Sequence, residues 1–447
     1  MDFEKHNFYI VEEKLKITGK NILWVLLVLG FCFFGCEYLP EIEKKEIKEV
    51  EKSKPLWTFI IYMAGDNELS ASALEDLNEL EEAKAVSDKI QIFALVDFAG
   101  DGNLSSNSGT FLFKIKNDFE DSEDIVSERI ACPPLGLRTD EEIEINLADS
   151  SVLEKTIDFI KGEYPSQEYG LIMWGHGTGY KSANIPEKTR GFAVDDTSGE
   201  YMSTINFAKA INTKNLSVIG FDSCFGMLLE IIYEIKDCGK YFIGSSGLVP
   251  ANGWNYKTVF SEFAKNLENS QESGEDFCKI AVNHFENLYS SNEKLKISYL
   301  ELEQVRKISE KFDKLAKKIG ENIIDKSSQE KFFNILFNDV KSYYNNYGAT
   351  DLYLDLYSLA DKMLQEGIEE ATELKDVLLQ NKKNLNIGIH FAALTSEGII
   401  KERHSNSYIK NDKIINEQLR FVAENQYWVP NYETKDSVLD KLFYTNF

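Results

Sequence analysis

Apolar runs alternate with helically spaced apolar positions from residue 57 to about residue 250 of this chain. The runs are rich in β-branched and aromatic residues, a composition typical of buried strands. They predict strands at residues 57–65, 89–100, 109–117, 169–177, 216–224 and 240–248. Apolar residues three and four apart predict helices that begin near Ser70 and span residues 151–162 and 225–235.

This alternation predicts an α/β fold with a mainly parallel β-sheet flanked by helices. Functional residues are then expected on loops at the carboxyl ends of the strands. After about Thr258 the pattern becomes helix-rich, and one helix is marked by Val305, Ile308, Phe312, Leu315 and Ile319. Residues 296–303 and 385–394 are strand-like segments that either extend the sheet or belong to a second subdomain. We favour one architecture with a helical insertion.

The first 35 residues are typical of a lipoprotein signal peptide. Residues 22–35 are continuously apolar, follow several lysines, and are shorter than the ~20 residues that a membrane-spanning helix needs. Gly35 and Cys36 then match the small residue and cysteine at which bacterial lipoproteins are cleaved and acylated, which predicts lipidation at Cys36. Phe33 and Phe34 depart from that pattern, so an uncleaved membrane anchor is the alternative.

Residues 36–55 are dense in Glu and Lys and cannot build a core. We interpret them as a charged tether, although a short solvated helix also suits alternating charge. The folded part then divides into a core at residues 56–257 and a helix-rich region at residues 258–447 that completes or extends it. The expected location is the bacterial cell envelope or surface, with attachment to the membrane through the N-terminal lipid.

The chain carries a formal net charge of -25, from 74 Asp and Glu against 49 Lys and Arg. Such a surface repels phosphate backbones, so nucleic acid is not expected as a partner. Cationic ligands are favoured, although charge kept for solubility is the simpler explanation. Beyond Cys36 the cysteines are widely spaced without a CxxC pair, which argues against a disulfide framework. Cys132, Cys238 and Cys278 are expected to be buried apolar residues.

A histidine flanked by glycines ends the predicted strand at residues 169–177. His176 lies between Gly175 and Gly177, and glycine permits positive φ and close approach of the backbone to a ligand. A phosphate-binding loop is the alternative, but residues 180–191 do not begin the helix that a dinucleotide loop requires. We therefore interpret His176 as a histidine presented for chemistry at the edge of the sheet.

Cys224 lies between the end of a predicted strand at residues 216–224 and a predicted helix at residues 225–235. The positive end of a helix and its N–H groups lower the pKa of a thiol and favour the nucleophilic thiolate. The other isolated cysteines lack this combination of a strand end and a helix start. We therefore expect Cys224 to be a nucleophile.

Together these motifs resemble the clostripain family of cysteine peptidases, which have a caspase-like fold. In that family one strand ends in His-Gly and the next ends in Asp-x-Cys. The resemblance extends over roughly residues 57–432, with further matches at residues 57–69, 191–203, 245–256 and 296–305. It implies a cysteine endopeptidase that acts on protein or peptide substrates, needs no cofactor for its chemistry, and has its catalytic core at residues 56–257.

The resemblance also implies roles for individual residues. Cys224 is then the nucleophile, His176 the general acid/base, and the amides of Gly177 and Cys224 the oxyanion hole. Asp222 corresponds to an acid at the floor of an S1 pocket for Arg or Lys, and Asn252 lies in the segment that resembles the pocket wall. From the residues alone, Asp222 has a second explanation as the cap of the following helix.

Two regulatory features complete these expectations. Related peptidases are matured by cleavage between the His and the Cys, which implies self-cleavage after Lys188 or Arg190 on an exposed loop. Calcium activates some relatives, and Asp195 and Asp196 are candidate Ca2+ ligands. Two adjacent acids also suit a solvated turn.

Other classes of function fit the sequence less well. A zinc peptidase is disfavoured because the histidines are scattered and no HExxH is present. A serine hydrolase is disfavoured because residues 244–247 lack the GxSxG spacing and a following helix. His390, within an apolar strand, is interpreted as a core or edge residue. The remaining alternative is an inactive surface lipoprotein that keeps the fold as a binding module, against which the presence of Cys224 and His176 argues.

Overall fold

The computed structural model describes residues 54–100, 108–120, 122, 124–179, 191–292, 295–344, 352–380, 385–391, 427–428 and 437–443. The expected signal peptide, Cys36 and most of the tether lie outside these residues, as do Lys188 and Arg190. Lys54–Phe447 forms one compact unit. Among the described residues, no helix combines the length and apolarity needed to cross a bilayer.

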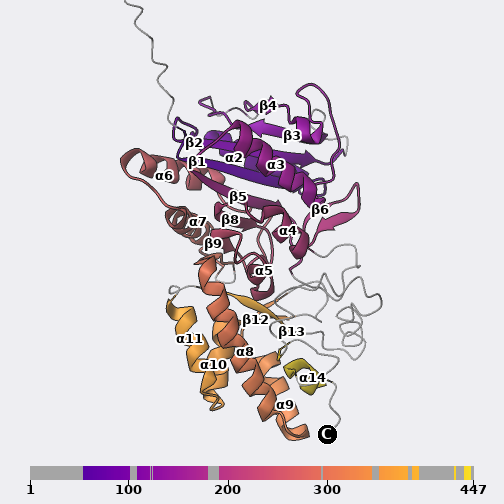
Figure 1. Ribbon diagram of the computed structural model, residues 1–447, viewed down its shortest axis with the longest axis vertical. Helices are drawn as coiled ribbons and strands as arrows, with labels where there is room; N and C mark the ends of the chain where they lie inside the picture. Colours follow the sequence, from indigo (N-terminus) through magenta and orange to yellow (C-terminus); the bar gives the residue numbers. More distant parts are fainter. Residues whose placement is uncertain are drawn as a thin grey trace, which may run out of the picture. The chain divides into compact units, whose positions relative to one another are not determined.

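Eight of the described strands form one sheet, in the order β10-β9-β8-β5-β1-β2-β3-β4 (Figure 1). The pairs from β9 through β8, β5 and β1 to β2 are parallel, and β10, β3 and β4 join antiparallel at the edges. The strands are β1 (Trp57–Gly65), β2 (Ile90–Phe98), β3 (Gly109–Lys114), β4 (Glu128–Ile130), β5 (Glu168–Gly175), β8 (Leu216–Asp222), β9 (Gly239–Gly244) and β10 (Ser298–Glu301). The predicted mainly parallel α/β sheet is confirmed.

Helices cover both faces of this sheet, which explains why its strands read as continuous apolar runs. Along β1, Ile60 and Tyr62 pack into one core and Phe59 and Ile61 into the other, because successive side chains of a strand point to opposite faces. One face is covered by α2 (Ser70–Glu82), α6 (Tyr256–Asn269) and α7 (Gly274–Leu288). The other is covered by α3 (Ser150–Glu163), α4 (Thr204–Ile211), α5 (Leu229–Glu234) and α8 (Val305–Asn322).

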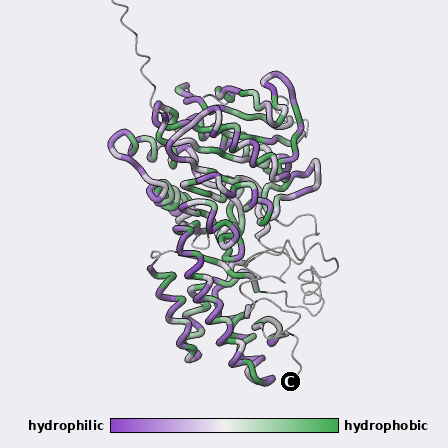
Figure 2. Tube along the Cα trace, in the orientation of Figure 1, coloured by the Kyte–Doolittle hydropathy of each residue, from purple (hydrophilic) through white to green (hydrophobic). Residues whose placement is uncertain are grey.

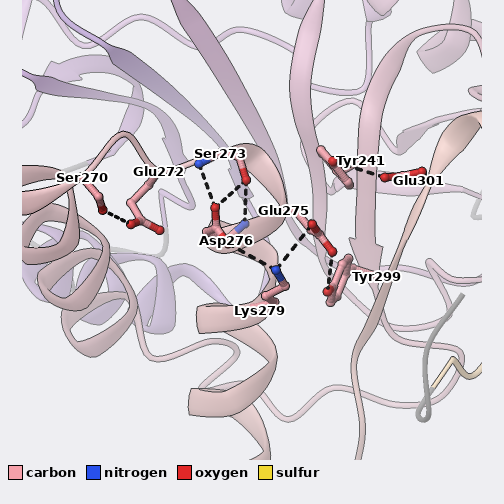
Figure 3. Close-up of polar contacts among 9 residues, drawn as sticks. All are labelled: Tyr241, Ser270, Glu272, Ser273, Glu275, Asp276, Lys279, Tyr299 and Glu301. Atoms are coloured by element: carbon pink, nitrogen blue, oxygen red, sulfur yellow. Dashed lines mark hydrogen bonds and ion pairs between the residues drawn. The ribbon is translucent and has the colours of Figure 1, made fainter.

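Polar contacts fix the start of α7 against the edge of the sheet (Figure 3). The helix begins with a capping box, in which the Asp276 amide donates to Ser273 Oγ at 3.3 Å and the Ser273 amide donates to Asp276 Oδ2 at 3.0 Å. In the same first turn, Glu275 Oε1 accepts a 3.3 Å hydrogen bond from the hydroxyl of Tyr299 on β10. Cap and tyrosine together hold this helix in place on the β9–β10 edge.

After α6 and α7, the helix-rich part continues with α8, which buries all five apolar residues predicted to share one face. Its polar residues form the opposite side of the helix (Figure 2). It continues with α9 (Lys326–Asn334), a π-helix (Ile335–Asp339), α10 (Leu356–Gln365), α11 (Glu370–Gln380) and α14 (Val438–Phe443). Short 3-10 helices span Pro133–Leu135 and Leu302–Gln304.

The two strand-like segments of the helix-rich part belong to different sheets. Residues 296–303 contain β10, which extends the main sheet next to β9. Residues 385–394 contain β13 (Gly388–Phe391), which joins β11 (Ser342–Tyr344) and β12 (Leu352–Asp355) in an antiparallel three-stranded sheet. A separate β-hairpin is formed by β6 (Phe192–Asp195) and β7 (Glu200–Met202).

The cysteines outside the nucleophile position are core residues, as predicted. Cys132, Cys238 and Cys278 are all buried, and the described cysteines form no disulfide with one another. Burial raises the pKa of the Cys132 thiol to about 11 and that of Cys278 still further. These thiols are therefore poor nucleophiles at neutral pH.

Candidate active site

His176 and Cys224 follow two adjacent parallel strands at the same edge of the sheet. β5 ends at Gly175 and β8 at Asp222, and Trp174 on β5 is in register with Asp222 on β8. Both His176 and Cys224 line one pocket of about 400 Å³. The structure therefore brings together the two residues that the sequence singled out, which lie far apart along the chain.

Two glycines allow these turns to approach so closely. Gly175 has a φ of 126°, and a Cβ on it would lie 2.8 Å from the carbonyl oxygen of Ala64 on β1. A Cβ on Gly177 would lie only 2.2 Å from the carbonyl oxygen of Cys224. No other residue type fits at Gly177 without a shift of the backbone, so the histidine turn and the cysteine turn pack directly against each other.

His176 has an acidic neighbour that the sequence pattern did not reveal. Its Nε2 atom lies 3.0 Å from Glu68 Oε1, on the loop that follows β1. Among the described residues no acceptor meets hydrogen-bond geometry at Nε2, so the contact is an ion pair only when His176 is protonated. Because the side chain of Glu68 is 75% exposed, this pair adds at most about 1 kcal/mol to the free energy of unfolding.

Cys224 does not lie at a helix N-terminus, which corrects the prediction of a helix at residues 225–235. The helix α5 begins only at Leu229. The intervening backbone pairs with the segment after β9, since the Phe225 amide donates to the Gly247 carbonyl at 2.9 Å and the Met227 amide to the Ser245 carbonyl at 2.8 Å. These long-range hydrogen bonds replace the helical ones, and Phe225 takes a left-handed φ of 55°.

The thiol of Cys224 is therefore not activated by a helix dipole. Burial raises its pKa, the Val249 amide opposes that shift, and the nearby Asp222 carboxylate adds to it. The Sγ atom accepts a 3.2 Å hydrogen bond from the Val249 amide. A thiol in this environment remains protonated at neutral pH, so an adjacent base is needed to make it nucleophilic.

The backbone offers donors beside the thiol. In the described part of the chain, neither the Gly177 amide nor the Cys224 amide donates a hydrogen bond to another residue. Both belong to the two turns that pack against each other at the pocket. They are thus available to a developing negative charge on a bound carbonyl oxygen.

Asp222 is buried and lines the same pocket as His176 and Cys224. Its Oδ2 accepts 2.9 Å hydrogen bonds from the Trp254 amide and the Tyr256 hydroxyl, while its Oδ1 is buried without a partner. Burial raises its pKa to about 7 against the effect of these donors, and Glu79 adds to the rise. The helix-cap explanation is wrong, because α5 has no side-chain cap.

Asn252 is exposed and is not among the residues that line this pocket, which corrects its predicted place in the pocket wall. The reason is a turn in which the Gly253 amide donates to the Pro250 carbonyl at 2.9 Å and Gly253 has a φ of 46°. The turn places Ala251 and Gly253 on the pocket. Any Cβ on Gly253 would lie 2.5 Å from Asp222 Oδ2.

A second acid lies behind the pocket, on α2. Asp76 is buried, and its Oδ2 accepts a 2.6 Å hydrogen bond from Nε1 of Trp174, a residue of the pocket wall. Burial and the neighbouring Asp222 raise the pKa of Asp76 to about 9. It is therefore neutral at pH 7 and anchors Trp174 without adding charge. In the sequence its helical position gave no sign of this contact.

Four carboxylates meet near the same edge of the sheet: Asp66, Asp97, Glu144 and Asp195 each place one oxygen within 4.8 Å of the others. Asp97 Oδ2 is buried without a hydrogen-bond partner. Burial raises the pKa of Asp97 to about 8 and that of Glu144 to about 7. The group is therefore an acidic cluster able to hold a metal ion.

Only one of the two predicted calcium ligands belongs to this cluster. Asp195 is buried within it, whereas Asp196 is exposed and outside it. The backbone explains the difference, since the Asp196 amide donates to the Asp66 carbonyl at 3.0 Å while the side chain of Asp195 accepts from the Leu147 amide at 3.1 Å. The other members come from separate loops and strands and carry no shared motif.

Comparisons with known proteins agree with this arrangement. The family model described as the Clostripain family matches residues 61–447. Clostripain of Hathewaya histolytica is 23% identical over 391 residues, which cover 78% of this chain and 73% of that protein.

Solved structures show the same fold. An inactive zymogen of a C11 protease from Parabacteroides distasonis has a TM-score of 0.58 at 18% identity and covers 83% of this chain and 99% of its own. A secreted C11 cysteine protease from Bacteroides thetaiotaomicron, in complex with an irreversible peptide inhibitor, has a TM-score of 0.57 at 18% identity with the same coverage.

Proposed function

The chain belongs to the clostripain family of cysteine peptidases, and on that premise we propose that Cys224 is its nucleophile and His176 its general acid/base. One observation carries the proposal: one pocket is lined by both side chains and by the buried carboxylate of Asp222, whose Oδ1 has no hydrogen-bond partner among the described residues. Because burial raises the pKa of the Cys224 thiol, that thiol needs a general base beside it, and His176 is the base that we propose.

In the proposed reaction, His176 takes the thiol proton while the sulfur of Cys224 attacks the carbonyl carbon of the scissile peptide bond. The oxyanion accepts hydrogen bonds from the amides of Gly177 and Cys224. His176 then gives its proton to the leaving amine as the C–N bond breaks, which leaves a thioester on Cys224. Water deprotonated by His176 hydrolyses the thioester, releases the carboxylic acid and restores the thiol.

We extend the proposal to cleavage after Arg or Lys. A guanidinium or ammonium group in the pocket would meet Asp222, whose Oδ1 has no other partner among the described residues. A buried charge of this kind is stabilised by an opposite charge with good hydrogen-bond geometry. The walls of the pocket are largely apolar and suit the methylene stems of both side chains.

The P1 preference is tested with three peptide substrates that differ only at P1, carrying Arg, Lys or norleucine. We expect kcat/KM for the basic substrates to exceed that for norleucine by at least about 100-fold, because only they neutralise the buried carboxylate. Initial rates of hydrolysis measure this. Equal rates for all three would contradict the basic preference. No hydrolysis of any substrate would favour the inactive binding module.

Self-processing and location complete the proposed function. We propose that the peptidase cuts itself after Lys188 or Arg190, both between His176 and Cys224 in the sequence. We also propose that a lipid on Cys36 holds the enzyme at the bacterial surface. Its substrates would then be proteins at that surface. A bacterial relative with the same fold is described as secreted. Mass spectrometry of the N-terminus tests the anchor, because an unmodified or intact leader would contradict it.

Calcium is the metal that best fits the cluster of Asp66, Asp97, Glu144 and Asp195. The donors are all carboxylate oxygens, which Ca2+ prefers, and the unpartnered Asp97 Oδ2 provides a ligand atom with no competing hydrogen bond. A bound cation neutralises the mutual repulsion of these acids. Asp66 is close in sequence to Glu68, the neighbour of His176, so a cation here orders the loop beside the active site.

Calcium is therefore expected to stabilise the folded protein. At a concentration 100 times the Kd, binding adds about 2.7 kcal/mol to the free energy of unfolding, which raises Tm by several degrees. Thermal unfolding with Ca2+ or with EDTA measures the shift, and Asp97→Asn is expected to remove it. The control Asp237→Asn, an acid paired with Arg306 outside the cluster, should keep it. An equal shift in Asp97→Asn would contradict this site.

A further inference from the structure

One tyrosine of the C-terminal region contacts both catalytic turns. Tyr353 on β12 is fully buried, and its hydroxyl donates a 3.2 Å hydrogen bond to the carbonyl oxygen of Thr178. Its ring centroid lies 5.0 Å from that of Phe225. Thr178 comes two residues after His176, and Phe225 comes directly after Cys224. One side chain therefore connects the two segments that bear the proposed catalytic dyad.

The fit between Tyr353 and the histidine turn leaves no spare room. Gly179 has a φ of 73°, and a Cβ on it would lie 2.5 Å from the Tyr353 hydroxyl oxygen. Only glycine therefore lets the chain pass over the tyrosine at this point. The hydroxyl and the backbone of the turn are held at a fixed separation.

The cysteine turn is constrained from the same side. Phe225 has a left-handed φ of 55°, a conformation rare for a bulky residue unless the surroundings impose it. The small sheet that carries Tyr353 is also bound to the segment after Phe225, because the Gly388 amide on β13 donates to the Met227 carbonyl at 3.0 Å. The ring of Tyr353 thus packs against Phe225, and the sheet that carries Tyr353 is hydrogen-bonded to the chain just after Phe225.

We propose that Tyr353 is a positioning residue that sets the relative placement of the His176 and Cys224 turns. This inference rests on the proposed roles of those two residues. Tyr353 is not among the described residues that line the pocket, and its contacts with the two turns are made through Thr178 and Phe225. A misplacement of about 1 Å between reacting groups costs on the order of 100-fold in rate, which makes this contact matter for turnover.

The test is Tyr353→Phe, which keeps the ring against Phe225 and removes the hydrogen bond to Thr178. We expect kcat to fall about ten-fold with little change in KM, because the substrate pocket is untouched. The second-order rate of alkylation by iodoacetamide should fall in parallel, since it reports how well His176 activates the thiol. Gly179→Ala displaces the same contact from the other side and should lower kcat as well.

The matched control is Tyr343→Phe on the neighbouring strand β11. The Tyr343 side chain is also buried, and its hydroxyl lies 2.5 Å from Asp355 Oδ2 and 3.2 Å from Asn386 Oδ1. Both of these described partners lie outside the two catalytic turns. Loss of the Tyr343 hydroxyl is expected to lower Tm and leave kcat unchanged. Wild-type kcat in Tyr353→Phe, or an equal loss of kcat in Tyr343→Phe, would overturn the inference. Cys224→Ala in the same series keeps the two claims apart, because its activity tests only the dyad.

Discussion

Replacement of Cys224 by alanine is expected to lower kcat/KM of the peptidase by about 10⁴-fold or more, the scale seen when a catalytic nucleophile is removed. Among the described residues, no other thiol lines the pocket of Cys224 and His176. The described cysteines outside it are buried in the cores. Initial rates on a substrate with Arg at P1 measure the loss.

Cys238→Ala is the matched control for this variant. Cys238 is buried and its Sγ lies 3.7 Å from the Ala208 carbonyl oxygen, outside the pocket. Its removal leaves a small cavity and is expected to change Tm while kcat/KM stays within about two-fold. Hydrolysis that survives Cys224→Ala would exclude the thiol mechanism. Loss of activity in both variants would point to a general effect on folding.

The Cys224→Ala variant also tests self-processing. Wild-type protein is expected to migrate as two fragments on a denaturing gel, because Lys188 and Arg190 match the proposed basic P1 preference. The Cys224→Ala chain should stay intact, and Lys188 and Arg190 replaced together by Gln should also remain uncut while small substrates are still hydrolysed. A wild-type chain that never divides would contradict self-cleavage without touching the dyad.

The sequence predicted the main sheet and the meeting of His176 and Cys224 because both depend on local patterns. Strand ends are marked by Gly175 and by the run up to Asp222, and parallel order brings such ends to one edge. The helix after Cys224 was predicted wrongly because its backbone pairs with residues 245–247 instead. That pairing is not visible in the apolar spacing of residues 225–235.

Other parts of the site depend on contacts between distant segments. Glu68 and Asp76 lie near the active site only because the loop after β1 and the helix α2 pack beside β5. The adjacent acids Asp195 and Asp196 predicted Asp195 as a metal ligand, whereas the sequence around Asp97 predicted only a strand. Its burial beside other acids is a property of the sheet edge and has no signature in the local sequence.

Asp222→Asn is expected to reduce kcat/KM for substrates with Arg or Lys at P1 by about 100- to 1,000-fold. Loss of one partner from a buried charge pair costs about 2–5 kcal/mol, while norleucine at P1 makes no such pair. The asparagine keeps a carbonyl oxygen for the Trp254 amide and the Tyr256 hydroxyl, so the fold around it is preserved. The expected result is therefore a loss of preference rather than a general loss of activity.

The pH dependence gives an independent check on the same residue. The pKa of Asp222 is raised to about 7, so in the free enzyme it takes up a proton as the pH falls below that value. A neutral carboxyl attracts a cation less, and KM for basic substrates should therefore rise as the pH is lowered through about 7. Glu79 and Asp76 on α2, Tyr256 on α6, Tyr289 after α7 and the thiol of Cys224 are titratable groups that interact with it.

In Asp222→Asn this rise of KM should disappear, because no proton can be taken up at that position. Asn252→Ala is the control, since Asn252 is exposed outside the pocket and its loss should change neither P1 preference nor pH profile. KM for norleucine at P1 should be independent of pH over the same interval in every variant. If Asp222→Asn still prefers Arg and Lys by 100-fold, the basic pocket must depend on another acid, and Asp222 would then serve only to hold Trp254 and Tyr256.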